Sequence, residues 1–189
     1  FDRETGVQEI TATLAKLLTP HPITLFAGQY GFVELNALTS VHYSAIASAN
    51  WLATARYMAL NEPQGILIDI GSTTTDILLF KDGTVHAQGY TDYDRLVSGE
   101  LIYTGIIRTP VMAVAQRAIF RGREQGLMAE YFATMADVYR LTGDLREAHD
   151  QTPAADGGLK TQSASALRLS RMTGYDFKDA DLPLWREFA

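Results

Sequence analysis

The most informative segment of the sequence is Asp69-Ile70-Gly71-Ser72-Thr73-Thr74-Thr75-Asp76, which places two carboxylates and four hydroxyls around one glycine. The segment lies between the apolar runs 65–70 and 77–80, which have the length and composition of strands. The first run is almost continuously apolar, which is typical of a strand covered on both faces. Asp82-Gly83 then predicts a tight hairpin turn into a third strand over 85–89.

A turn of this composition can cradle a phosphate group. Gly71 lets the backbone approach a ligand closely, and successive amides can form an anion-binding nest. Neutral hydroxyl donors come from Ser72, Thr73, Thr74 and Thr75. Asp69 or Asp76 would then hold Mg²⁺, directly or through water. The second glycine and the lysine of a Walker A loop are absent. The alternative is a Ser- and Thr-rich turn that satisfies its own backbone.

Composition and charge exclude several classes of protein. The 189 residues are 47% hydrophobic and 20% charged, as in an ordinary globular protein. The net charge of −6 argues against nucleic acid as a partner. The chain has no cysteine, which excludes disulfides, thiol nucleophiles and Cys-ligated metals. No segment has the pattern of a membrane span or a signal peptide, so we expect a cytoplasmic protein that does not bind membranes.

The remaining periodicities predict one domain over 1–189, with an α/β part over 1–117 and a mainly helical part over 118–189. Helices are predicted over 5–18, 41–60, about 94–103, 127–139 and 161–172, with glycines after the last two at 143 and 174. Short strands are predicted over 23–27 and 30–35. The segment 110–120 fits a strand or a helix, and 150–158 is a loop.

Several polar residues outside the turn are candidates for chemistry. Tyr103, Thr104 and Arg108 would lie within one or two helical turns and could present a hydroxyl and a guanidinium to a phosphate. A surface arginine beside a half-buried tyrosine is the alternative. The four histidines are scattered, and no Gly-x-Ser-x-Gly elbow is present, so we assign neither a histidine metal site nor a serine hydrolase.

A second group of candidates lies on predicted helices. Glu130, Thr134 and Asp137 share one helical face at spacings of four and three, which is usually a solvated face. Asn50 lies among small residues, where its amide needs a hydrogen-bond partner, either structural or from a ligand. Asp156 in its loop is a further candidate for substrate contact.

The chain resembles the hydantoinase/oxoprolinase-like family of the actin, sugar-kinase and Hsp70-type ATPase superfamily. Asp69–Asp76 is similar to the second phosphate-binding hairpin of that superfamily. The resemblance extends to the branch linked to tetrahydromethanopterin one-carbon transfer, which includes the condensing enzymes of methanofuran biosynthesis. It covers most of the chain and is carried by further segments: 49–51, 91–92, 99–100, 103–105, 108–110 (Arg108-Thr109-Pro110), 120–122, 130–140 and 155–157.

The resemblance implies a fold, a reaction and a set of site residues. The fold is α/β, with an RNase H-like mixed sheet that carries the phosphate-binding hairpin, plus a helical portion. The reaction is a condensation in which a phenol displaces the diphosphate of an aminomethylfuran, with Mg²⁺ at Asp69 and Asp76. The implied catalytic residues are Asp69, Asp76, Tyr103, Arg108 and Asp137. The implied substrate-binding residues are Asn50, Thr104, Thr109, Glu130 and Thr134.

Two other functions remain open. One is an ATP-dependent hydrolase or kinase of the hydantoinase/oxoprolinase type, and the other is a non-catalytic regulatory subunit, which would expose an apolar interface. Family members begin with another phosphate hairpin and end with a Gly-rich segment, neither of which is recognisable in this chain. We therefore expect a fragment of a two-lobed protein that lacks upstream and downstream segments and that binds a phosphorylated small molecule. An oligomer is compatible with the sequence.

Overall fold

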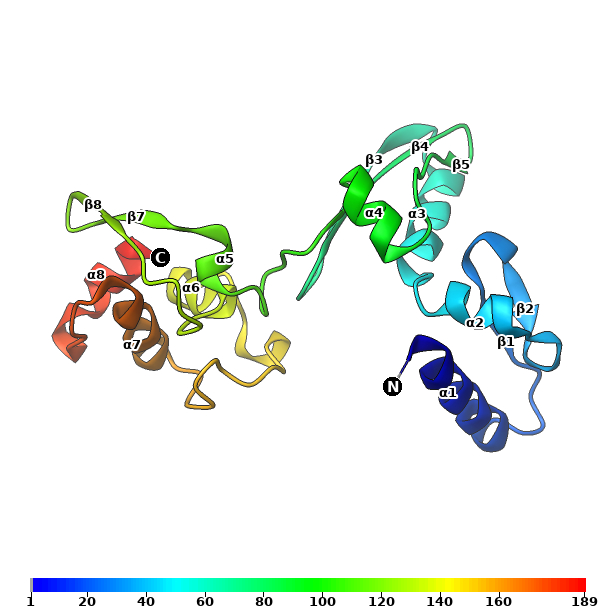
Figure 1. The fold of residues 1–189 in the computed structure, drawn as a ribbon, viewed down its shortest axis with the longest axis horizontal. Coiled ribbons are helices and arrows are strands. Elements are labelled where there is room, and N and C mark those ends of the chain that lie inside the picture. Colours follow the sequence, from blue (N-terminus) through cyan, green and yellow to red (C-terminus); the bar gives the residue numbers. More distant parts are fainter. Residues whose placement is uncertain (1) are drawn as a thin grey trace. The chain divides into compact units, whose positions relative to one another are not determined.

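The structure is a computed structural model that describes residues 2–189. The chain divides into two compact units (Figure 1). Unit 1 comprises the residues up to Asp69 together with Asp76–Ile102, and unit 2 comprises Ile70–Thr75 together with Tyr103–Ala189. The turn singled out from the sequence therefore belongs to unit 2, and the carboxylates that flank it belong to unit 1.

Unit 1 contains four α-helices and two small sheets. The helices are α1 (Arg3–Leu17), α2 (Ser40–Ile46), α3 (Asn50–Asn61) and α4 (Asp92–Ser98), with 3-10 turns at η1 (Gly28–Tyr30) and η2 (Leu35–Ala37). The first sheet pairs β1 (Thr24–Phe26) with β2 (Phe32–Glu34) in antiparallel register. The second contains β3 (Gln64–Ile70), β4 (Thr75–Lys81), β5 (Thr84–Val85) and β6 (Leu101–Ile102).

The core of unit 1 lies between α3 and the four-stranded sheet (Figure 1). Trp51, Leu52 and Ala55 of α3 pack with Leu78 of β4, and partly buried side chains from β3 and β5 surround them. The β4–β5 turn contains Asp82 and Gly83, both with positive φ, as the Asp-Gly pair predicted. The short strands at 24–26 and 32–34 and the first helix are also confirmed.

Three predictions for unit 1 need correction. The helix expected over 41–60 is two helices, because the chain turns at 47–49 and buries Ala49 beside Gly28. The strand at 65–70 is not covered on both faces, since Ile66, Ile68 and Ile70 are exposed along one face of β3. The helix expected to reach residue 103 ends at Ser98, because Gly99 adopts a left-handed conformation and the chain then enters β6 beside β4.

Unit 2 is built from a β-hairpin and helices that share one core. The hairpin pairs β7 (Arg117–Phe120) with β8 (Arg123–Gly126), and the helices are α5 (Val111–Val114), α6 (Met135–Thr142), α7 (Gln162–Thr173) and α8 (Leu182–Phe188). The 3-10 turns η3 (Glu147–His149) and η4 (Asp179–Asp181) complete the elements. Phe120, Leu169, Met172 and Trp185 lie at the centre of the core. Figure 1 shows α6, α7 and α8 beside the hairpin.

The helix expected over 127–139 is largely absent, because α6 begins only at Met135. The amides of Leu127 and Met128 donate to the carbonyls of Gln116 and Met172, so they are not available to a helix. Leu127 and Phe132 of the apolar pattern pack on the core from the irregular segment before α6, and Met135 and Val138 pack on it from α6. The segment 110–120 contains both α5 and β7, and α7 and the loop over 150–158 are confirmed.

The predicted α/β class is confirmed: helices combine with three small sheets over residues 2–189. The largest sheet carries the Asp69–Asp76 segment between β3 and β4. Within the same residues, no helix has both the length and the apolar character needed to cross a membrane.

Candidate functional site

The Gly71–Thr75 turn is held by the segment 104–108 of the same unit. The amide of Ile106 donates to the carbonyl of Gly71 at 3.0 Å, and the amides of Ile107 and Arg108 both donate to the carbonyl of Ser72, at 3.1 and 2.9 Å. Thr75 adds a hydroxyl bond to the carbonyl of Thr104 at 2.8 Å. The bonds from the supporting segment occupy the carbonyls of Gly71 and Ser72, and the Gly71 amide donates to the carbonyl of Thr74 at 2.8 Å.

Gly105 explains how the two segments come so close. A Cβ atom on this residue would lie 2.5 Å from both the carbonyl oxygen of Gly71 and the amide nitrogen of Thr73, which is far inside van der Waals contact. Glycine is therefore required where the backbones of the two segments touch. Thr109 is buried, and its hydroxyl accepts a hydrogen bond from the amide of Gly105 at 2.7 Å. This bond fixes the supporting segment.

Arg108 places a cation directly at the turn. Its Nε donates to the hydroxyl of Thr73 at 2.6 Å, and the hydroxyls of Ser72 and Thr73 lie 3.3 Å apart. Arg108 and Ser72 are exposed, so the guanidinium and the hydroxyls are accessible from solvent. Within unit 2, the amides of Ser72, Thr73 and Thr74 form no further hydrogen bond. A guanidinium beside hydroxyl and amide donors is a suitable arrangement for the oxygens of a phosphate.

The supporting segment is itself anchored to the start of α6. Met135 donates its amide to the carbonyl of Thr109 at 2.9 Å, and Ala136 donates to Ile107 at 3.2 Å. Thr134 and Asp137 form a capping box at this helix terminus, with the Thr134 amide 3.1 Å from the Asp137 carboxylate. Thr134 and Asp137, two predicted site residues, therefore contribute to the foundation of the turn.

A buried ionic cluster lies behind this capping box. The Asp137 carboxylate accepts from Arg168 at 2.8 Å and from Ser165 at 2.7 Å, and it lies 3.4 Å from Arg140. Arg140 also donates to Asp150. These side chains are almost completely inaccessible to solvent. Because its oxygens are already occupied, Asp137 holds structure in this arrangement.

Asp156 joins the same cluster at its solvent edge. Its carboxylate accepts from Arg168 at 2.8 Å and lies 3.2 Å from Arg171. Partial burial acts to raise the pKa of Asp156, but hydrogen bonds from Arg168 and Gly158 and the charges of both arginines outweigh it and lower the pKa. Burial likewise acts to lower the pKa of Arg168, yet the carboxylates of Asp156 and Asp137 raise it, so Arg168 stays charged.

The two carboxylates that flank the turn differ in their surroundings within unit 1. The Asp76 carboxylate is 2.6 Å from the Arg95 guanidinium, which is 1% exposed and also stacks on the Trp51 ring at 3.9 Å. Asp69 is exposed at the end of β3. Asp76 is thus neutralised inside the fold, whereas the Asp69 carboxylate faces solvent. The sequence analysis did not identify Arg95, because Arg95 is 19 residues from Asp76 and no local pattern indicates that the two side chains are paired.

The other predicted site residues are dispersed. Thr104 contacts the turn, because its carbonyl accepts from the Thr75 hydroxyl, and Tyr103 precedes it; both lie in an irregular segment and not on a helix. Glu130 is exposed in the irregular segment before α6. Asn50 is the exposed first residue of α3, so its amide is not buried among small residues as the sequence suggested. Among residues 2–189, no group of three or more acidic or histidine side chains is placed to hold a metal.

The fold and this site define an α/β protein in which a glycine- and hydroxyl-rich turn is held against an arginine-bearing segment. The chain belongs to the hydantoinase/oxoprolinase family, whose model matches residues 4–173. This match confirms the resemblance seen in the sequence.

Two curated relatives carry the same name, (4-{4-[2-(gamma-L-glutamylamino)ethyl]phenoxymethyl}furan-2-yl)methanamine synthase. The protein of Methanocaldococcus jannaschii is 35% identical over 175 residues, which is 90% of this chain and 51% of the relative. That of Methanococcus vannielii is 34% identical over 107 residues, which is 57% of this chain and 48% of the relative. The chain thus spans about half the length of the curated relatives it matches.

Proposed function

We propose that this chain is the diphosphate-binding part of a condensing enzyme of cofactor biosynthesis. Its substrate would be an aminomethylfuran activated as a diphosphate, and its acceptor a phenol with a γ-glutamylaminoethyl arm. The observation that carries the proposal is the contact between Arg108 and Thr73 on the Gly71–Thr75 turn. The name of the two relatives supports the choice of reaction, because it describes a furan and a phenol joined through a phenoxymethyl ether.

The reaction balances without a further reactant. The phenol oxygen attacks the CH₂ carbon of the furan, a carbon–oxygen ether bond forms, and the bond from that carbon to the diphosphate breaks. The diphosphate leaves with the bonding electron pair, and the phenolic proton passes to a base and then to water. Because negative charge develops on the departing oxygen, cations and hydrogen-bond donors around the diphosphate lower the barrier.

The turn residues would supply that stabilisation. The Arg108 guanidinium is held by Thr73 through Nε, so its remaining N–H groups can bridge two phosphate oxygens. The hydroxyl of Ser72 and the amides of the turn add neutral donors in a fixed backbone. The rigid support from Gly105 and Thr109 means that little reorganisation accompanies the change in charge.

Asp69 is the carboxylate that we assign to Mg²⁺. Magnesium is bound by one or two carboxylates together with substrate phosphates and waters, and Asp69 is an exposed carboxylate that directly precedes the turn in the sequence. When bound, the ion would neutralise charge on the leaving diphosphate. Asp76 is assigned the role of fixing Arg95 in unit 1, since its carboxylate is already paired.

Calorimetric titration of pyrophosphate with Mg²⁺ into this chain tests the proposal. We expect saturable binding that Asp69→Asn weakens at least about tenfold. Asp82→Asn is the matched control, because Asp82 is an exposed carboxylate in the β4–β5 turn, and it should leave binding unchanged. Absence of binding by a folded chain, or equal effects of the two variants, would contradict the proposal.

The family match also supports a second candidate, an ATP-dependent hydrolase or kinase. The same titration with ATP separates the two. Binding of ATP without binding of pyrophosphate favours this second function. Binding of neither ligand favours the non-catalytic subunit.

A further inference from the structure

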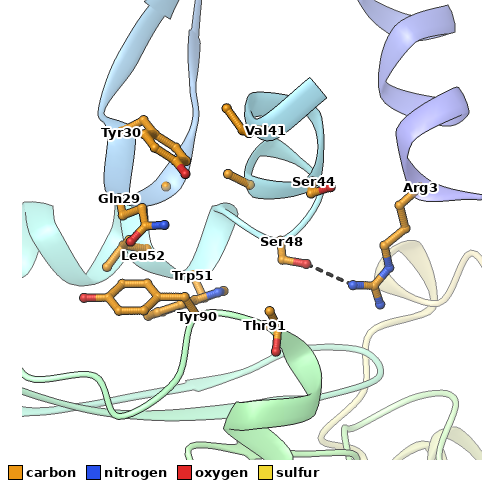
Figure 2. A pocket seen from close by; sticks show the side chains of 12 residues that line it. Arg3, Gln29, Tyr30, Val41, Ser44, Ser48, Trp51, Leu52, Tyr90 and Thr91 are labelled. Atoms are coloured by element: carbon orange, nitrogen blue, oxygen red, sulfur yellow. Dashed lines mark hydrogen bonds between the residues drawn. The ribbon is translucent and has the colours of Figure 1, made fainter. Parts of the chain in front are cut away.

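A pocket in unit 1, remote in sequence from the Gly71–Thr75 turn, has the features of a binding site for an aromatic ligand. It lies among α1, η1, α2, α3 and the segment before α4, and its volume is about 420 Å³ (Figure 2). The roles assigned above to the residues of the turn do not involve it. A cavity of this size accommodates a small molecule, and its wall combines aromatic rings with a few hydroxyls.

Two tyrosines offer ring faces to this pocket. Tyr90 is 46% exposed and Tyr30 is 48% exposed, although both line a concave surface. Tyr30 is braced by an edge contact with His42 at 5.2 Å between ring centroids. Exposed aromatic rings in a hollow lose unfavourable hydration when a second ring stacks on them.

Trp51 lies at the inner wall and contributes a donor. It is 4% exposed, and the Arg95 guanidinium covers one face of its ring at 3.9 Å, so that face is not free for stacking. Its indole N–H is buried without a hydrogen-bond partner. Figure 2 shows the indole nitrogen on the side of the ring toward Ser48 and Thr91. A buried donor without an acceptor is destabilising, and an oxygen on a ligand would satisfy it.

Polar groups stand opposite the rings. Ser48 accepts a hydrogen bond from Arg3 at 3.0 Å, and Arg3 is also paired with Asp92. Ser44 and Thr91 supply further hydroxyls on the wall. The pocket therefore has aromatic faces, one unpartnered N–H, and neutral or internally balanced polar groups. It matches an uncharged aromatic ring with an oxygen acceptor.

We infer that this pocket binds a phenol, with the ring against Tyr90 and the phenolic oxygen accepting from the indole N–H of Trp51. The aromatic and acceptor requirements follow from the pocket alone. The choice of a phenol rests on the proposed function, because the relatives' name contains a phenoxy group with an amide-bearing ethyl arm.

The test uses N-acetyltyramine and, as its partner, N-acetyl-2-phenylethylamine, which lacks only the phenolic oxygen. The indole N–H signals of the ¹⁵N-labelled chain report binding directly, since the protein has two tryptophans. Trp185→Phe removes the other signal and assigns the one from Trp51. We expect N-acetyltyramine to shift the Trp51 signal downfield in a saturable way, and its partner to bind about tenfold more weakly.

Variants locate the site. Tyr90→Ala should weaken binding about fivefold to tenfold through lost stacking. Tyr57→Ala is the control, because Tyr57 is an exposed tyrosine of α3 that does not line the pocket, and it should bind as the original chain does. No saturable shift up to about 10 mM, or equal binding of the two compounds, would overturn the inference.

These titrations contain neither pyrophosphate nor Mg²⁺, so the two proposals fail separately. Phenol binding without pyrophosphate binding would leave the pocket in place and remove the proposed condensation. Pyrophosphate binding without phenol binding would keep the turn and remove the pocket.

Discussion

The ionic cluster around Asp137 and the turn around Thr73 use the same kinds of side chain for opposite purposes. In the cluster, Asp137, Arg168 and Ser165 satisfy one another, and solvent has almost no access. At the turn, Arg108 and Ser72 are exposed and carry unused donors. A buried charge without a partner is costly, so buried charged groups need partners within the protein. An exposed donor is solvated by water and stays available for a ligand. Accessibility, and not residue type, separates the structural cluster from the turn that we propose to bind phosphate.

The largest effect is expected from breaking the cluster. Asp137→Ala leaves Arg168 and Arg140 buried with less compensation, which should lower the free energy of unfolding by about 3–5 kcal/mol. Asp176→Ala removes an exposed carboxylate of the same unit and should change it by less than about 0.5 kcal/mol. Urea denaturation measures both. Similar stability of the two variants would show that the cluster is not the anchor of unit 2.

The second prediction concerns the backbone contact beneath the turn. Gly105→Ala forces a methyl group against Gly71 and Thr73, which should cost about 1–3 kcal/mol and displace the turn. Pyrophosphate binding should then weaken by about tenfold or more. Gly126→Ala introduces a methyl group with no heavy atom within 4 Å, so it is the matched control. Unchanged pyrophosphate affinity in Gly105→Ala would separate the turn from anion binding.

The third prediction isolates the exposed guanidinium. Arg108→Ala should lose about 1.5–3 kcal/mol of pyrophosphate binding, because a charged hydrogen bond is removed, while the unfolding midpoint stays within error. Arg123→Ala removes another exposed arginine of unit 2 and should leave binding intact. Calorimetry and thermal unfolding of both variants make the comparison. A large loss of stability in Arg108→Ala would assign Arg108 to the fold.

The smallest effect is a pH dependence at the edge of the cluster. The folded pKa of Asp156 is lowered, so its ionised form contributes stability above the unfolded pKa, and this contribution is lost as pH falls through the folded pKa. The chain should therefore exceed Asp156→Asn in stability at neutral pH, and the difference should shrink in acid below the usual aspartate range. Thermal midpoints of both proteins across that range measure it. A difference independent of pH would contradict the role of the Asp156 charge.

Local patterns in the sequence were sufficient for several elements. The Asp-Gly pair predicted the β4–β5 turn, and Gly174 marked the end of α7, because both depend on backbone conformations that few residues adopt. The apolar period over 127–139 was misleading for residues before Met135, because an irregular segment that packs on the core can repeat its apolar residues as a helix does. Apolar periodicity indicates which side chains are buried, but it does not indicate which carbonyls accept hydrogen bonds from the backbone amides.

For the candidate site, local sequence was sufficient to identify the glycine, the hydroxyls and the carboxylates of Asp69–Asp76 and to place them between two strands. Which polar groups have a partner within the protein depends on the tertiary structure. Arg108 donates a hydrogen bond to Thr73, Asp76 forms an ion pair with Arg95, and Asp137 forms an ion pair with Arg168. Each of these contacts joins residues 19 or more positions apart, so no local spacing encodes them. Long-range packing determines which charges are compensated and which remain available for a ligand.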